Sequence, residues 1–203
     1  MIGVDLLILL LTALACALVA AAVTPLLRRE LTSRGWVAWL HVPLAAAAGA
    51  GAAALAETTP ELVAFAAAGT VIALLMVVDL LEHRLPDRLV APAWLALVLP
   101  LTFTGDWNGL GRALLASVTC LVVYFALAWI SPAGMGLGDV KFAAVVGTFL
   151  GWFGWSHVLW GTLLAFALNA VVSLLALIRG RRGSELPFGP LMVVGAILAV
   201  TFR

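Results

Sequence analysis

Long apolar stretches recur along the chain, and short segments containing charged residues, proline or glycine separate them. A helix needs about 20 mostly apolar residues to cross the hydrocarbon layer of a bilayer. Stretches that approach or reach this length lie at residues 4–26, 36–56, 61–80, 89–104, 112–131, 139–154, 157–178 and 187–202. The pattern predicts an all-α protein, a polytopic transmembrane helix bundle with about 8 spans.

The sixth stretch, residues 139–154, is the weakest of these candidates. It is short, and both Asp139 and Lys141 lie within it. The sequence therefore leaves a second arrangement open, with about seven spans and one re-entrant segment in place of the sixth.

The composition agrees with a membrane protein. Apolar residues make up 65% of the chain and charged residues only 10%, and the mean hydropathy is +1.18. Soluble domains contain about 25% charged residues, and a core of this size is too small to hide so much apolar surface from water. We expect a single membrane domain over residues 1–203, with the lipid bilayer as its main partner. Its run Ala45–Leu55, rich in alanine and glycine, predicts close helix packing.

Lysine and arginine set the orientation, because cytoplasmic loops carry an excess of them. In the eight-span arrangement, one side holds Arg28, Arg29, Arg34, Arg84, Arg88, Lys141, Arg179, Arg181 and Arg182. The other side holds Arg112 and Arg203. The first side is therefore predicted to be cytoplasmic and both termini to face outward. The net charge of +1 gives no basic excess that would indicate binding to nucleic acid.

The two cysteines, Cys16 and Cys120, lie inside apolar stretches and form no CxxC pair. A structural zinc site needs four clustered cysteine or histidine ligands. We therefore expect no metal site and no cofactor.

Asp79 closes the very apolar stretch Val71–Val78, and Pro86 follows a few residues later. Proline interrupts a helix and restricts the residue before it, so the third span is predicted to end soon after Asp79. Ionisable groups at the edge of a span are expensive and are candidates for function. The alternative is that Asp79 only marks the boundary with water.

A second acid, Asp139, follows a segment with glycine at positions 134, 136 and 138. These glycines allow backbone conformations closed to other residues, and they allow another chain to approach closely. Asp139 stands at the start of an apolar helix, where a carboxylate is favoured by the helix dipole. Asp139 could therefore simply cap this helix rather than take part in function, although capping does not explain a second acid on the same side.

Two carboxyl groups brought together suit peptide hydrolysis. An ionised carboxylate can take a proton from water, while a neutral carboxyl donates to the substrate carbonyl. Two close carboxylates do not both ionise readily, and aspartic proteases use this sharing of a proton.

Three segments resemble the type IV prepilin peptidase family of intramembrane aspartyl proteases. Gly136-Leu137-Gly138-Asp139 matches the glycine-x-glycine-aspartate motif of such proteases, and the following Val140-Lys141 is typical of prepilin peptidases. The stretch from Asp79 to Leu89, with its Pro86-Asp87 pair, resembles the first catalytic segment. Pro187-Phe188-Gly189-Pro190 resembles the C-terminal region.

The resemblance implies an aspartic endopeptidase that cleaves basic leader peptides from prepilin or pseudopilin substrates at the cytoplasmic face of a bacterial inner membrane. It implies that Asp79 and Asp139 are catalytic. Gly136, Gly138, Lys141, Pro86 and Asp87 would support the site or bind substrate. Asp87 is a weaker alternative for the first acid, and Lys141 either biases Asp139 toward its ionised form or extends to the lipid headgroups.

The resemblance covers residues 61–202 as a peptidase-like core, and residues 1–60 are expected to add two N-terminal spans. Many family members carry paired CxxC motifs in an N-terminal segment associated with N-methylation. The loop Arg28–Arg34 is too short to replace such a segment. We therefore expect a short form without N-methyltransferase activity.

The sequence leaves two other functions open. A small transporter or proton-coupled channel could use the same carboxylates as a relay, although such a relay favours acids near the middle of the bilayer. A catalytically silent pilus-assembly scaffold could keep the fold without the chemistry.

Overall fold

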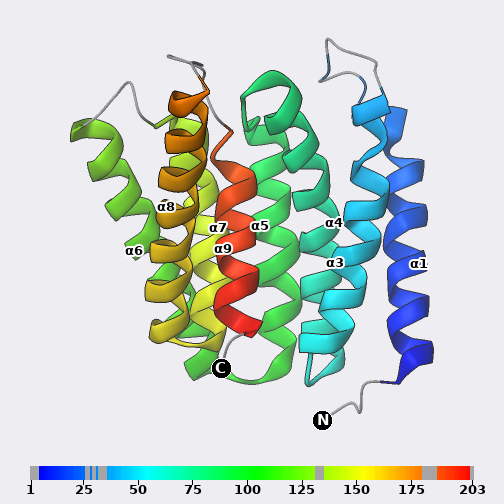
Figure 1. Cartoon of the computed structure of the whole chain (residues 1–203). Coiled ribbons are helices and arrows are strands. Elements are labelled where there is room, and N and C mark those ends of the chain that lie inside the picture. The colour runs from blue at the N-terminus through cyan, green and yellow to red at the C-terminus, as the bar shows by residue number, and fades with distance from the viewer. Residues whose placement is uncertain are drawn as a thin grey trace. The chain divides into compact units, whose positions relative to one another are not determined.

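The computed structural model describes residues 5–25, 28, 31, 36–130, 135–179 and 187–201. This part of the chain contains eight α-helices and two short 3-10 helices (Figure 1), which confirms the prediction of an all-α bundle. The chain divides into two compact units, Met1–Trp107 and Asn108–Arg203. Each unit is described by itself.

Four α-helices are described in full in the first unit. They are α1 (Leu6–Ala22), α3 (His41–Leu55), α4 (Thr59–Glu82) and α5 (Asp87–Leu101), with the 3-10 helices η1 (Trp36–Trp39) and η2 (Thr102–Thr104). Helix α3 packs on α1 and on α4, and α5 packs on α4. The connections from α3 to α4 and from α4 to α5 are only three and four residues long, so these helices are neighbours in space, as in up-and-down bundles.

Both ends of α4 are fixed by specific contacts. At its start the Glu61 amide donates to Thr58 Oγ1 at 3.4 Å, and the Thr58 amide donates to Glu61 Oε2 at 3.3 Å, which forms a capping box. At its end His83 adopts a left-handed conformation with φ 50°, and its amide donates to the Asp79 carbonyl at 3.0 Å. The helix therefore ends three residues after Asp79, in agreement with the sequence prediction.

Small residues let α1, α3 and α4 approach one another closely. A Cβ added to Gly49 on α3 would lie 2.6 Å from the carbonyl oxygen of Thr12 and 2.8 Å from Cys16 Sγ, both on α1. A Cβ added to Gly69 on α4 would lie 2.8 Å from the Cβ of Ala48. This agrees with the close packing predicted for residues 45–55. Such packing drives helix association where lipid supplies no hydrophobic force between helices.

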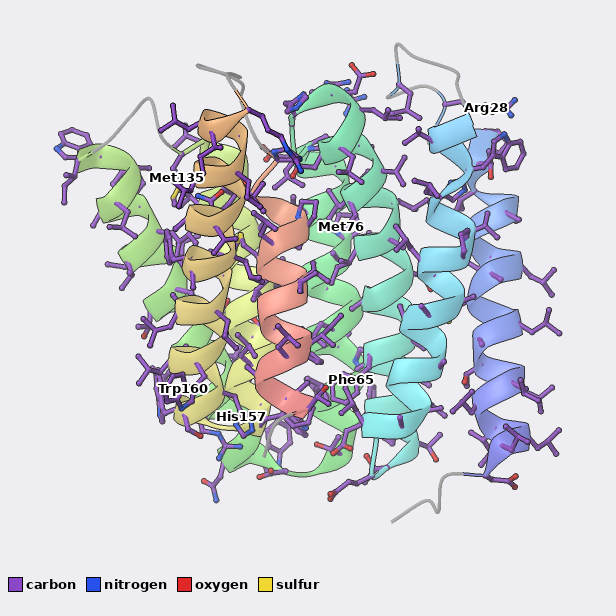
Figure 2. All side chains as sticks on the ribbon, in the orientation of Figure 1. Arg28, Phe65, Met76, Met135, His157 and Trp160 are labelled. Atoms are coloured by element: carbon purple, nitrogen blue, oxygen red, sulfur yellow. The ribbon has the colours of Figure 1, made fainter. Side chains whose placement is uncertain are left out.

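The second unit contains α6 (Trp107–Ile130), which begins at the boundary, α7 (Leu137–Phe153), α8 (Trp155–Ile178) and α9 (Gly189–Thr201). Figure 2 shows Met135, just before α7, at one end of this unit and His157, in the first turn of α8, at the other. Within the described residues α7 is thus one continuous helix along the unit rather than a re-entrant hairpin.

Polar side chains join α6 to α7. Arg112 Nε donates to the carbonyl of Gly151 at 2.8 Å, and its Nη2 donates to the carbonyl of Trp152. Ser117 Oγ donates to the carbonyl of Ala144 at 2.9 Å. Because the last carbonyls of a helix have no partner within it, the guanidinium caps the C-terminal end of α7.

Four described helical segments are long and apolar enough to cross a membrane: Thr59–Glu82, Asp87–Thr104, Trp107–Ile130 and Trp155–Ile178. Helices α1, α3 and α9 are shorter and also apolar. The chain is therefore a multi-pass membrane protein.

The glycines of α3 give a test of this packing. Gly49→Ala is expected to lower the free energy of unfolding by about 1–3 kcal/mol, because the added methyl group overpacks the contact with α1. Gly51→Ala is the matched control, since nothing lies within 4 Å of a Cβ at that position. It should be neutral or stabilise by up to about 1 kcal/mol, the usual gain for alanine over glycine in a helix. Thermal unfolding of the purified variants in detergent measures both, and equal midpoints would contradict the packing.

Candidate active site

Asp79 lies in the last turns of α4, and its side chain is only 4% exposed. The residues before it, Val77 and Val78, are fully buried and pack with Leu74 and Leu31 in an apolar cluster. Met76, labelled in Figure 2, lies on the same part of α4 and is also buried. The first acid is therefore held on a rigid, well-packed helix, close to the point where that helix ends.

The turn after Asp79 is anchored by an apolar side chain. Leu85 is buried, whereas its neighbours His83 and Arg84 are exposed. Pro86 is half-buried in an extended conformation and is the N-cap residue of α5. Asp87 is exposed in the first turn of α5, where the helix dipole favours an acid. Pro86 and Asp87 thus both take part in starting α5, whether or not they also contact a substrate.

Asp139 lies in the first turn of α7 and is half-buried. Its Oδ2 accepts a hydrogen bond from the amide of Gly136, the N-cap residue, at 3.2 Å. This is one half of a capping box, since glycine has no side chain to supply the other half. The capping alternative raised by the sequence is therefore present in the structure, and the same carboxyl remains partly accessible.

The glycines beside Asp139 do not use the conformations reserved for glycine. Gly136 has φ −76° and ψ 152°, an extended backbone open to any residue, and Gly138 is not among the described glycines with positive φ. Gly134 lies outside the described residues. What Gly136 supplies is open space, because it is exposed and lacks a side chain next to the carboxyl. The expectation that these glycines adopt backbone conformations closed to other residues is wrong for Gly136 and Gly138. The expectation that they allow another chain to approach closely stays a prediction.

Lys141, two residues after Asp139 on α7, is exposed. Below the first turn, Phe142 and Val145 are buried in the second unit. Asp139 is therefore held at the end of a packed helix, as Asp79 is. The two acids belong to different units of the chain.

An aromatic cluster that the sequence analysis did not single out holds the start of α9. The ring of Tyr124 lies 5.4 Å from that of Phe166 and 6.2 Å from that of Phe188, and the last two rings are 5.3 Å apart. Phe188 belongs to the Pro-Phe-Gly-Pro segment, and both Tyr124 and Phe188 are buried. The signal available in the sequence was that Tyr124 is the single tyrosine of the chain.

No group of three or more histidine, cysteine, aspartate or glutamate side chains that could hold a metal ion occurs among the residues the structure describes. The described residues instead include two candidate carboxyl groups, those of Asp79 and Asp139, and each lies at the end of a packed apolar helix. This defines a class of protein, a multi-pass helical membrane protein with acids at the ends of its helices.

Comparison with known proteins gives the family. Residues 66–178, which include Asp79 and Asp139 and more than half of the chain, match the type IV leader peptidase family. The chain therefore belongs to this family. No solved structure shows a significant match to the chain.

Similar proteins of this family come from several bacteria. A prepilin leader peptidase/N-methyltransferase of Burkholderia pseudomallei is 33% identical over 161 residues, which cover 74% of this chain and 50% of the relative. Proteins of the same name from Pseudomonas putida and Aeromonas salmonicida are 31% and 32% identical, and the matches cover 62% and 64% of this chain and 46% of each relative. The chain thus spans about half the length of the curated relatives it matches.

The capping bond of Asp139 can be tested apart from any chemistry. Asp139→Ala is expected to lower the free energy of unfolding by about 1 kcal/mol, because the Gly136 amide loses its acceptor. Asp139→Asn should unfold close to the wild type, since an amide oxygen can accept the same bond. Thermal unfolding in detergent measures the difference, and an alanine variant as stable as the wild type would show that the bond contributes nothing.

Proposed function

We propose that this protein is an aspartic endopeptidase that removes basic leader peptides from type IV prepilin or pseudopilin substrates, with Asp79 and Asp139 as its catalytic pair. The main support is that the leader peptidase match covers both acids. The names of the relatives describe two activities, leader peptide cleavage and N-methylation. The proposal concerns cleavage alone, because the matched family is one of leader peptidases.

In the proposed mechanism the two carboxyl groups share one proton. The ionised carboxylate takes a proton from a water molecule, whose oxygen attacks the carbonyl carbon of the scissile peptide bond. The neutral carboxyl donates its proton to the carbonyl oxygen. Collapse of the tetrahedral intermediate then breaks the C–N bond: the protonated carboxyl gives its proton to the leaving amine, and a hydroxyl of the intermediate gives its proton to the ionised carboxylate, which restores the shared proton.

Other residues would position the substrate. Gly136 is exposed beside the Asp139 carboxyl and leaves its backbone open to an extended peptide, and Gly138 is half-buried next to it. Asp87 is exposed and acidic, which suits a basic leader. Pro86 would hold the turn that follows Asp79, and Lys141, on the other side of α7 from Asp139, would extend its ammonium group to the lipid headgroups. An apolar helix following the scissile bond would remain in the bilayer.

The proposal places the protein in a bacterial inner membrane with the acids on the cytoplasmic side. The excess of arginine in the turns near these acids supports this orientation. Arg28 is part of that excess, and its guanidinium carbon lies 5.0 Å from the ring centre of Trp39.

The catalytic assignment predicts the effect of removing either acid. Asp79→Asn and Asp139→Asn should each lower the rate of leader cleavage by at least about 100-fold, because proton transfer by one carboxyl is lost. The rate is measured with purified enzyme in detergent and a leader-bearing prepilin, by the shift in substrate mass.

Two further variants complete this experiment. Asp106→Asn, at an exposed acid after η2, should retain full cleavage. Asp87→Asn should lower the rate only partly, through weaker binding of the leader. Substantial cleavage by Asp79→Asn together with none by Asp87→Asn would move the first catalytic role to Asp87. Ion flux through vesicles that depends on Asp79, without any cleavage, would indicate the transporter function instead.

The orientation can be measured at the two ends of α5. Arg84 precedes this helix and Asp106 follows it, and both are exposed. In a background with Cys16 and Cys120 replaced by alanine, a membrane-impermeant maleimide applied to spheroplasts should label Asp106→Cys. It should label Arg84→Cys only after the membrane is permeabilised. The reverse pattern would place the end of α4 that carries Asp79 on the outer side and would refute the orientation.

A further inference from the structure

A hollow of about 420 Å³ lies within the second unit, between the last turns of α6 and the first turns of α7. Its size falls within the usual range for ligand pockets, roughly 300–1,000 Å³. It is lined by Leu121, Val122, Phe125, Leu137, Val140 and Lys141.

The hollow opens on the surface of the helices rather than into their core. Four of its apolar side chains, those of Leu121, Val122, Phe125 and Leu137, are between 38% and 63% exposed, and Val140 forms its buried floor. In a multi-pass membrane protein, exposed aliphatic and aromatic side chains on helices of this kind face hydrocarbon. An apolar chain is therefore the natural occupant of the hollow.

Lys141 is the one cationic residue of the lining. It stands four residues after Leu137, so its Cα lies about 6 Å along α7 from the start of the helix. A lysine stem can cover apolar surface and extend its ammonium group to the headgroup level. The lining thus combines an apolar trough with a positive charge near one end, which complements a molecule that has an apolar tail and an anionic head.

The hollow lies on the side of α7 away from Asp139. Successive residues of an α-helix are rotated by about 100°, which places Leu137, Val140 and Lys141 on one side and Asp139 on the opposite one. A peptide helix seated in the hollow would therefore have α7 between itself and the Asp139 carboxyl. This favours a lipid over a substrate peptide.

We propose that this hollow is a binding site for an anionic phospholipid, with one acyl chain against the apolar lining and the phosphate against the Lys141 ammonium. The ammonium donates charge-assisted hydrogen bonds to phosphate oxygens. A zwitterionic lipid has a phosphate too, but its own headgroup cation competes for it. The site would therefore prefer phosphatidylglycerol to phosphatidylcholine, independently of any peptidase activity.

The test measures lipid retained by the purified full-length chain in detergent, by native mass spectrometry with dioleoyl phosphatidylglycerol or dioleoyl phosphatidylcholine. The wild type should retain phosphatidylglycerol over phosphatidylcholine by about five-fold, the effect of one lysine on an anionic lipid. Lys141→Gln should remove this preference, whereas Lys141→Arg should keep it. Val122→Trp, which fills the hollow, should lower retention of both lipids.

Two controls lie on the same unit outside the hollow. Val171→Trp changes an exposed position of α8, and Arg179→Gln removes an exposed cation at the end of α8. Both should retain phosphatidylglycerol as the wild type does. Equal retention of the two lipids by the wild type, or an unchanged preference in Lys141→Gln, would overturn the proposal.

A photo-crosslinking amino acid at Val122 keeps the proposal testable if a variant fails to fold. In vesicles of equal parts phosphatidylglycerol and phosphatidylcholine that also contain a leader-bearing peptide, adducts enriched in phosphatidylglycerol support the site. An adduct with the peptide would overturn the lipid assignment and make the hollow a substrate site.

Discussion

The absence of water from the bilayer constrains every polar group of this chain. A group that loses water must find a partner inside the protein or reach the surface. Arg112 donates hydrogen bonds to the terminal carbonyls of α7, and Ser117 donates one to another carbonyl of the same helix. The Nε2 atom of the buried His41 lies within hydrogen-bond distance of Thr24 Oγ1, at 3.0 Å, and of the carbonyl oxygen of Ala20, at 3.2 Å. Acids near the middle of a span would be costly, so helix ends are where this chain can hold them.

The ends of α4 and α7 solve this problem by different local means. Helix α4 ends in the left-handed His83, which costs roughly 1–2 kcal/mol in a residue other than glycine and has to be offset by surrounding contacts such as the burial of Leu85. Helix α7 begins at Leu137, after the N-cap residue Gly136, and the Asp139 carboxyl itself accepts a hydrogen bond from the amide of Gly136. The first acid is thus held by the packing of its helix, and the second takes part in forming its own helix end.

The sequence predicted what depends on hydrophobic length and on proline, and it missed what depends on contacts between distant residues. Every predicted span overlaps a helix, and the weak sixth span is the continuous α7. The interruption by Pro86 correctly indicated the end of α4. The left-handed His83 and the capping of α7 by Arg112 could not be predicted, because both depend on the three-dimensional packing. The roles of Asp79 and Asp139 remain predictions, since each acid has been located only within its own unit.

The helices that precede the family match pack against the helix that holds Asp79. The match begins at residue 66, within α4, and leaves out α1 and α3. Yet Cys16 and Ala20 of α1 and Ala45 of α3 form one buried cluster with Ala73 of α4. Because α4 lies against these small side chains, we expect a change in α1 or α3 to shift the helix that carries Asp79. We therefore infer that the first helices are part of the scaffold of the candidate site rather than an independent addition to it.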